Sequence, residues 1–135
     1  MGKRSTPYRP KSFESDGNKS DTSSNIYISM LMSKSWQALT KNAQLLYVYC
    51  KAQYYAEKRK PKPDYRQLTE QEQRQCFTMN KSKWKDLYRL YTNEGQFYKD
   101  RDLLVQYGFI EIIENGKNTR TKSIYMLSDK WREKP

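Results

Sequence analysis

The sequence predicts a mainly helical α+β fold that ends in a β-hairpin. Three observations predict this fold class. Residues 40–60 and 80–91 carry apolar residues at helical spacing. Residues 109–127 contain two alternating apolar runs, separated by a loop that includes the turn signal Asn115-Gly116. Finally, a length of 135 residues suits one domain with one core.

The N-terminal segment differs in composition from the rest of the chain. Residues 1–25 are rich in Ser, Asp, Asn and Lys, and their only large apolar residues are Met1, Tyr8 and Phe13. Such a segment buries too little apolar surface to offset the entropy lost on ordering it. We therefore expect a disordered tail, followed by a folded domain at residues 26–135. The tail has five basic and three acidic residues, so +9 of the net charge of +11 belongs to the domain.

The first half of the domain is expected to contain a strand and two helices. Residues 26–30 can form a short strand, and Ser33 begins one or two helical turns. Thr40 is a suitable N-cap for a longer helix. Residues 58–63 supply a Lys and Arg cluster for its C-terminus and then two prolines that end it. The predicted inward face of this helix consists of Ala43, Leu46, Tyr47, Cys50 and Tyr54.

A loop, a short strand and a second helix are expected next. Residues 61–75 are polar and poorly periodic, which indicates a loop, and residues 75–79 are a candidate strand. Asn80 is placed to cap a helix that ends before the break at residues 92–95. The predicted inward face of that helix consists of Trp84, Leu87, Tyr88 and Tyr91.

The next predicted helix begins at Glu94 or Gln96 and ends at Tyr107. Asp100 and Arg101 occupy positions where the helical pattern requires apolar residues, so we expect them to pair or to form hydrogen bonds there. The apolar inward positions are Phe97, Leu104 and Tyr107.

Gly108 is placed to end this helix in the left-handed conformation, which glycine adopts at little cost. Two alternating strands follow, and Trp131 is expected to close the core. In the first strand Ile110 and Ile112 share one face. In the second strand the residues that share a face are Ile124 and Met126.

Several classes of protein are disfavoured by composition. Cys50 and Cys76 make no disulfide framework, and the absence of histidine excludes a Cys/His zinc site and histidine-dependent catalysis. No phosphate-binding glycine loop, secretory signal or apolar run of membrane-spanning length is present. We therefore expect a cytoplasmic, non-enzymatic protein that needs no metal or cofactor.

The order of helix, helix, turn, helix and basic hairpin is the layout of a winged helix-turn-helix. SKSWQALTKNAQLLYVY resembles the opening helix of winged-helix proteins carried by plasmids, phages and integrative conjugative elements of Gram-positive bacteria. QFYKDRDLLVQYGFIEIIENGKNTRTKSIYMLSDKW resembles their recognition helix, wing and closing tryptophan. The resemblance covers about residues 26–132. It implies binding of double-stranded DNA and a role in maintaining, regulating or transferring a mobile element, and both replication-initiator-like and regulator-like members remain open.

Candidate DNA-binding residues follow from this layout. Near the start of the recognition helix, Gln96 and Lys99 can read base edges, whereas Tyr98 can either do so or pack inward. Lys83 is a candidate for phosphate contact at the preceding helix. The wing carries three cations and neutral hydrogen-bonding groups that suit the DNA backbone, and the candidates there are Lys117, Asn118, Arg120 and Lys122.

An alternative function remains open. The basic face can instead bind an acidic protein partner, and Asp100 and Asp102 favour this alternative because carboxylates in the recognition helix repel phosphate. A homodimer on repeated half-sites is also possible, although no surface in the sequence identifies a dimer face. The aromatic side chains at helical spacing are expected in the core rather than in a stacking surface: Trp36, Tyr47, Trp84, Tyr88 and Trp131.

Overall fold

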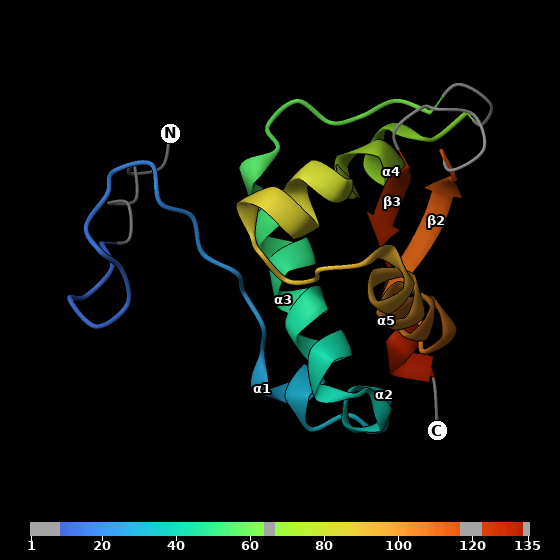
Figure 1. Cartoon of the computed structure of the whole chain (residues 1–135), viewed down its shortest axis with the longest axis horizontal. Coiled ribbons are helices and arrows are strands. Elements are labelled where there is room, and N and C mark those ends of the chain that lie inside the picture. Colours follow the sequence, from blue (N-terminus) through green and yellow to red (C-terminus); the bar gives the residue numbers. More distant parts are fainter. Residues whose placement is uncertain (1–8, 64–66, 117–122, 134–135) are drawn as a thin grey trace, which may run out of the picture.

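The computed structural model describes residues 9–63, 67–116 and 123–133, in which helices pack against a three-stranded antiparallel sheet (Figure 1). The spatial order of the strands is β1-β3-β2. The expected α+β class is thus confirmed. The helical elements are α1 (Ile28–Leu31), α2 (Lys34–Ala38), α3 (Lys41–Ala56), α4 (Glu70–Arg74), η1 (Ser82–Leu87), α5 (Glu94–Gln106) and η2 (Lys130–Glu133). The strands are β1 (Cys76–Thr78), β2 (Ile110–Glu114) and β3 (Ile124–Leu127).

The strand expected at residues 26–30 is wrong, because α1 occupies this segment. The amides of Met30 and Leu31 both donate to the carbonyl of Tyr27, so the backbone closes a helical turn. Met30 and Leu31 pack against the core while Ile28 is exposed, which is helical rather than alternating burial.

Helices α2 and α3 begin where the sequence predicts. The Ser33 hydroxyl accepts a hydrogen bond from the Trp36 amide at 3.1 Å, and the Thr40 hydroxyl accepts one from the Ala43 amide at 3.1 Å. Beyond the end of α3, Lys60 donates from Nζ to the carbonyl of Tyr54. The buried residues of α3 are Ala43, Leu46, Tyr47, Cys50 and Gln53, so the predicted inward face is confirmed except that Tyr54 is only half-buried.

Helix α4 lies in a segment for which a loop was expected. Thr69 accepts a hydrogen bond from the Glu72 amide at 3.1 Å, and the Glu72 carboxylate accepts one from the Thr69 amide at 3.0 Å. This reciprocal pair is a capping box, and the tetrapeptide TEQE carries its sequence signature. The prediction gave too much weight to polarity and overlooked this signal.

The helix expected after Asn80 is shorter than predicted and has π geometry. The Tyr88 amide donates to the carbonyl of Lys83, five residues back, and this wider turn changes which side chains face inward. Trp84 is buried as expected, but Leu87 is 59% exposed, so its predicted inward position is wrong. The side chain of Asn80 accepts from the Ser82 hydroxyl instead of capping the helix.

The sheet carries apolar residues on both faces. Ile112 lies opposite Tyr125 in the β2–β3 register, and both pack against the main core together with Ile110. Ile124 and Met126 share the other face, where they form a small second cluster with Cys76. Each predicted pair therefore shares a face, but the two pairs occupy opposite faces of the sheet.

Gly108 and Trp131 join the end of α5 to the C-terminal segment. Gly108 has a φ of +84°, and a Cβ there would lie 2.6 Å from the Trp131 amide nitrogen, so the close approach also requires glycine. The Trp131 amide donates to the Gly108 carbonyl at 3.0 Å, and its ring stacks on Phe109 at 5.9 Å between centroids. The predictions for Gly108 and Trp131 are confirmed.

The part of the tail that the structure describes extends away from the helices (Figure 1). Its residues are almost all exposed up to Ser24, whose hydroxyl donates to the carbonyl of Val48 on α3 at 3.0 Å. Within the folded part, Cys50 and Cys76 are buried and form no disulfide, as expected.

Candidate nucleic-acid interface

Aromatic packing attaches the beginning of α5 to η1. The rings of Trp84 and Phe97 stack at 5.0 Å, and Tyr91 meets both of them edge-on. Asn93 caps α5, because its side-chain oxygen accepts a hydrogen bond from the Gln96 amide at 3.0 Å. The orientation of α5 is therefore set by the segment that precedes it.

Two charged side chains lie on the inner face of α5, and both form the polar contacts that were expected. Asp100 is 4% exposed and accepts a hydrogen bond from the Tyr91 hydroxyl at 2.7 Å. Arg101 is 9% exposed, donates to Asp102 at 2.9 and 3.1 Å, and lies 4.6 Å from the centre of the Tyr98 ring. Buried polar groups with such partners fix the rotation of a helix more narrowly than apolar contacts do.

The ionisation of these groups follows from their surroundings. Burial, followed by the hydrogen bond to Asp100, raises the pKa of Tyr91 above its ordinary value, so its hydroxyl remains a donor. Burial by itself lowers the pKa of Arg101, but hydrogen bonds to Tyr125 and Asp102 outweigh it and the pKa is raised. Of the three acidic residues in α5, Asp100 is buried, whereas Glu94 at the first turn and Asp102 are exposed, and Asp102 is paired with Arg101.

The outer face of α5 is polar and lies opposite the buried positions. Lys99 is exposed there, together with Gly95, Asp102 and Gln106. Gln96 is also exposed, but on the side of α5 that faces α3. The ring of Tyr98 is half-buried and contacts Phe97 at 5.3 Å, so the inward alternative accounts for much of this side chain.

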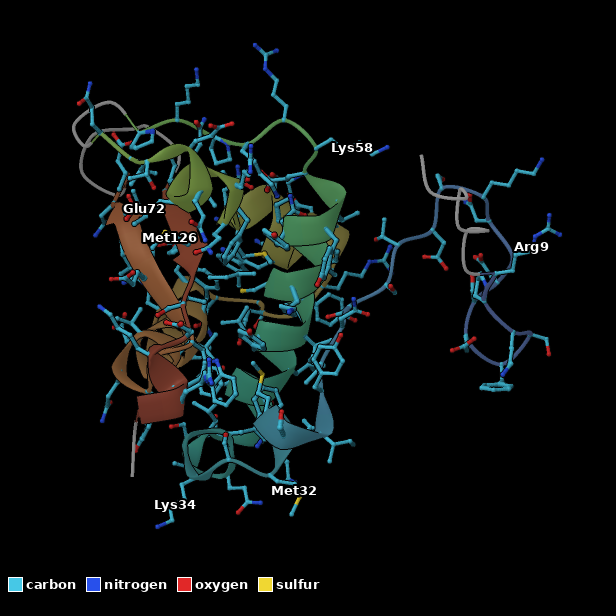
Figure 2. All side chains as sticks on the ribbon, turned by 180° about the vertical axis from the view of Figure 1, so that it is seen from behind. Arg9, Met32, Lys34, Lys58, Glu72 and Met126 are labelled. Carbon is cyan, nitrogen blue, oxygen red and sulfur yellow. The ribbon has the colours of Figure 1, made fainter. Side chains whose placement is uncertain are left out.

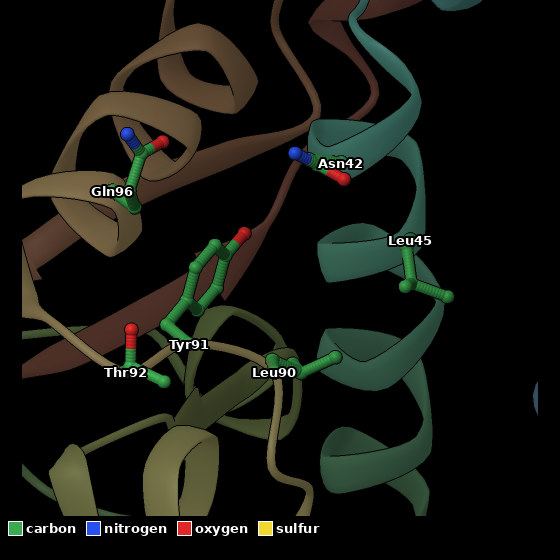
Figure 3. A pocket seen from close by; sticks show the side chains of 6 residues that line it. All are labelled: Asn42, Leu45, Leu90, Tyr91, Thr92 and Gln96. Carbon is green, nitrogen blue, oxygen red and sulfur yellow. The ribbon is translucent and has the colours of Figure 1, made fainter.

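Gln96 lines a shallow hollow between α3 and α5. In Figure 3 the amides of Gln96 and Asn42 stand on either side of the Tyr91 hydroxyl, whereas Leu45 points away from Gln96. The sequence reading did not identify Asn42 as a neighbour of Gln96. The two residues are 54 positions apart, and only the packing of α3 against α5 brings them together.

Lys83 within η1 and Lys81 immediately before it differ in their surroundings. Lys83, the candidate phosphate contact, is only half exposed. Lys81 is exposed, and its Nζ lies 3.9 Å from the Glu94 carboxylate at the start of α5. An exposed pair at this distance contributes little stability, so Lys81 remains available to another anion.

The β2–β3 hairpin follows α5 after a three-residue connection. Its described ends are joined by the Gly116 amide, which donates to the Ser123 hydroxyl at 3.0 Å. In β2, the pairing with β3 shifts between Ile112 and Glu114, which forms a β-bulge. The predicted contact residues at the hairpin tip lie outside the described residues, namely Lys117, Asn118, Arg120 and Lys122.

Comparisons with protein-family models, with curated proteins and with solved structures found no match to this chain. The candidate interface is therefore defined by its own geometry. Within residues 9–63, 67–116 and 123–133, no group of three or more Asp, Glu or Cys side chains is arranged to hold a metal ion. In the same residues, no helix combines the length and the apolar character that crossing a bilayer requires.

Proposed function

We propose that this chain is a winged helix-turn-helix protein that binds double-stranded DNA without catalysing a reaction. In this proposal η1 and α5 form the helix pair, α5 enters the major groove, and the β2–β3 hairpin is the wing. The element order supports it, because β1 precedes the helix pair, the β2–β3 hairpin follows it, and the three strands form one antiparallel sheet.

The observation that carries the proposal is the outer face of α5. No other described element covers this face, and Lys99 and Gln106 project from it on either side of Asp102. Gly95, near the N-terminus of α5, offers no side chain and so permits close approach of a nucleic-acid backbone. Lys99 can bond guanine or phosphate, and the Gln96 amide can bond adenine.

Charge supports the proposal in a second way. The net charge of +11 belongs mainly to the domain, and the predicted wing contributes three cations within six residues, Lys117, Arg120 and Lys122. Cations that replace condensed counterions supply sequence-independent affinity for a duplex. The buried Asp100 adds no repulsion at the surface, since its carboxylate faces Tyr91.

The biological setting in the proposal is a mobile genetic element, in whose regulation, replication or transfer the protein acts in the cytoplasm. This part rests on the resemblance of SKSWQALTKNAQLLYVY and of the α5–hairpin segment to winged-helix proteins of such elements. Selection of bound sequences from element-derived and random duplexes separates a specific site from general DNA affinity.

The proposal is tested by fluorescence anisotropy of a labelled random-sequence duplex with the double variant Lys117→Glu, Arg120→Glu. The matched control is Lys58→Glu, Arg59→Glu, which changes the net charge equally at exposed positions beyond α3. Lys58 lies on the other side of the molecule from the strand that carries Met126 (Figure 2). We expect the wing variant to abolish duplex binding and the control to weaken it only modestly. Equal effects of the two variants would contradict the wing assignment.

A second function is favoured by one observation: the Asp102 side chain is 63% exposed on the outer face of α5. A carboxylate at this position repels phosphate, whereas a protein partner can place a neutral or basic group beside it and its acidic groups beside the surrounding cations. Asp102→Asn distinguishes the two functions. It should strengthen duplex binding if α5 enters DNA, and it should leave duplex binding absent if the face serves only an acidic protein.

A further inference from the structure

Helix α3 is apolar on two faces. Its inner face packs into the core through residues such as Leu46 and Cys50. Its outer face carries a second series at spacings of three, four and three residues: Leu45, Val48, Ala52 and Tyr55. Leu45 is 48% exposed and Tyr55 is 38% exposed, so this series, the outer ridge, is open to solvent.

This spacing is that of a helix that contacts a second helix. Alternation of three and four residues places side chains along one narrow line, as in the a and d positions of a coiled coil. A helix at a protein surface normally carries polar residues on its outer side. The outer ridge is therefore not explained by the packing of α3 against α5 and β1.

In the described part of the chain, little covers the outer ridge. Tyr49, at one side of it, packs on Tyr88, the residue that follows η1, at 4.8 Å between ring centres. At the other side, Ser24 bonds the Val48 carbonyl, and the tail then turns away from α3 (Figure 1). Leu45 and Tyr55 lie beyond both contacts and keep their exposure.

The charges beside the outer ridge have one sign. Lys41 stands at its beginning, Lys51 lies along one side of it, and Lys58 is exposed just beyond the end of α3. Residues 41–56 contain no Asp or Glu. The next carboxylate, Glu57, accepts hydrogen bonds from Gln53 and Thr78 and is occupied within the fold.

We propose that the outer ridge of α3 binds an amphipathic helix of a partner protein, with an apolar stripe and acidic flanks. The apolar stripe would pack on Leu45, Val48, Ala52 and Tyr55, while the acidic flanks would meet Lys51 and Lys58. Charges beside the apolar line select the partner in paired helices. This site is separate from the outer face of α5, so it goes beyond the proposed DNA binding.

The charges argue against two other occupants. If two copies paired through this ridge in antiparallel orientation, their Lys51 side chains would come together. Both chains are strongly basic, and like charges repel. The described part of the tail offers only one large apolar side chain, Phe13, which is 83% exposed and so is not packed on the ridge. A helix with an apolar stripe and acidic flanks complements both the outer ridge and the lysines beside it.

The probe for the test is a labelled helical peptide of about three heptads with Leu at a and d and Glu at e and g. One control peptide replaces Leu by Ser, and another replaces Glu by Lys. Anisotropy with the full-length protein should show binding of the Leu/Glu peptide, with both controls at least about tenfold weaker. Equal binding of the Ser/Glu peptide would overturn the proposal, because charge alone would then explain the affinity.

Variants locate the binding on the outer ridge. Leu45→Glu with Ala52→Glu places two carboxylates on the ridge and should weaken binding of the Leu/Glu peptide at least about tenfold. The control, Gln37→Glu with Gln71→Glu, makes the same charge change at exposed positions on α2 and α4 and should have little effect. Leu45→Gln alone provides a milder change if the double variant fails to fold, and it should weaken binding in the same direction.

Two results would overturn the proposal. One is unchanged peptide binding by the folded ridge variants. The other is a wild-type dimer in analytical ultracentrifugation that Ala52→Glu converts to a monomer, because a second copy would then be the occupant. Duplex affinity should be lowered no more by the ridge variants than by the control with Gln37→Glu and Gln71→Glu, so a failure here is distinguishable from a failure of DNA binding.

Discussion

Helices α3 and α5 pack against each other but distribute their polar groups in opposite ways. Helix α3 buries Leu46 and Cys50 on its inner side and still exposes an apolar ridge on its outer side. Helix α5 buries Asp100 and Arg101 on its inner side and exposes Lys99 on its outer side. One helix is apolar around most of its circumference, whereas the other carries charge on both sides.

The difference indicates how the two helices serve the molecule. Apolar burial in α3 supplies stability that depends little on exact rotation. The hydrogen bond from Tyr91 to Asp100 requires one rotation of α5, which fixes the direction of Lys99 on the opposite side. Helix α5 is thus held in one orientation, as a surface that contacts bases must be. Helix α3 supplies core residues on its inner side and a surface suited to a helical partner on its outer side.

The largest expected effect is on the inner side of α3. Leu46 is 1% exposed, so Leu46→Ala should lower the free energy of unfolding by about 2–5 kcal/mol through lost burial and a cavity. The neighbouring change Leu45→Ala, at a position 48% exposed, should stay within about 1 kcal/mol. Urea denaturation of both variants checks this. Equal losses would contradict the assignment of inner and outer sides.

A smaller effect is expected at the polar inner side of α5. Tyr91→Phe removes the donor to Asp100 and leaves a buried carboxylate without this partner, which should cost about 1–3 kcal/mol of unfolding free energy. Tyr55→Phe is the control, because Tyr55 is exposed on α3. If α5 must be held in one rotation, Tyr91→Phe should also weaken duplex binding, measured by anisotropy at a temperature where the variant is folded. Unchanged duplex affinity would mean that the hydrogen bond from Tyr91 to Asp100 does not contribute to DNA binding.

The pH dependence of stability provides a further prediction. Burial, followed by the charges of Cys50 and Tyr55, raises the pKa of Tyr47, and burial followed by the bond to Asp100 raises that of Tyr91. Above the ordinary tyrosine pKa of about 10, the unfolded chain loses these protons while the folded chain keeps them, so stability falls as pH rises. The buried Cys50 thiol, whose pKa burial also raises, adds to the decline. The urea midpoint should therefore decrease between about pH 8 and 11, the range around the ordinary pKa values of tyrosine and cysteine. The decrease should be less steep in Tyr91→Phe, and a flat profile would contradict the prediction.

The smallest effect on stability is expected on the outer side of α5. Lys99→Gln should change the unfolding free energy by less than about 0.5 kcal/mol, since Lys99 is exposed. Its effect should instead appear in duplex binding, with the log–log salt slope reduced by about 0.9 if Lys99 contacts one phosphate. Lys62→Gln, at an exposed position in the loop after α3, is the control. If both variants show the same salt slope of duplex affinity, Lys99 does not contact a phosphate.

Helix α3 was predictable because its determinants are local. Thr40 supplies the cap, and Ala43, Leu46 and Cys50 follow at helical spacing. The outward direction of Lys99 follows from the same periodicity in α5. The π geometry of η1 was not predictable in this way, since helical spacing wrongly places Leu87 inward.

Other features depend on tertiary contacts that one sequence does not display. The hollow beside Gln96 includes Asn42 only because α3 packs against α5. The sheet also requires β1 to pair with β3, and the paired residues Thr78 and Ile124 are 46 positions apart in the chain. Its three-stranded form therefore did not follow from the hairpin signal. The capping box at Thr69 is different, because its signature was present in the sequence and was overlooked.

The most direct test of DNA binding by the folded domain is the salt dependence of duplex affinity with the tail cations replaced by Gln. The protein is titrated onto a random-sequence duplex by anisotropy in the full-length chain, with Lys3, Arg4, Arg9, Lys11 and Lys19 substituted. If Lys99 and the three wing cations each neutralise a phosphate, the log–log slope should be about −3.6. A flat dependence, or loss of binding on substitution of the tail alone, would contradict the assignment of α5 and the hairpin as the interface.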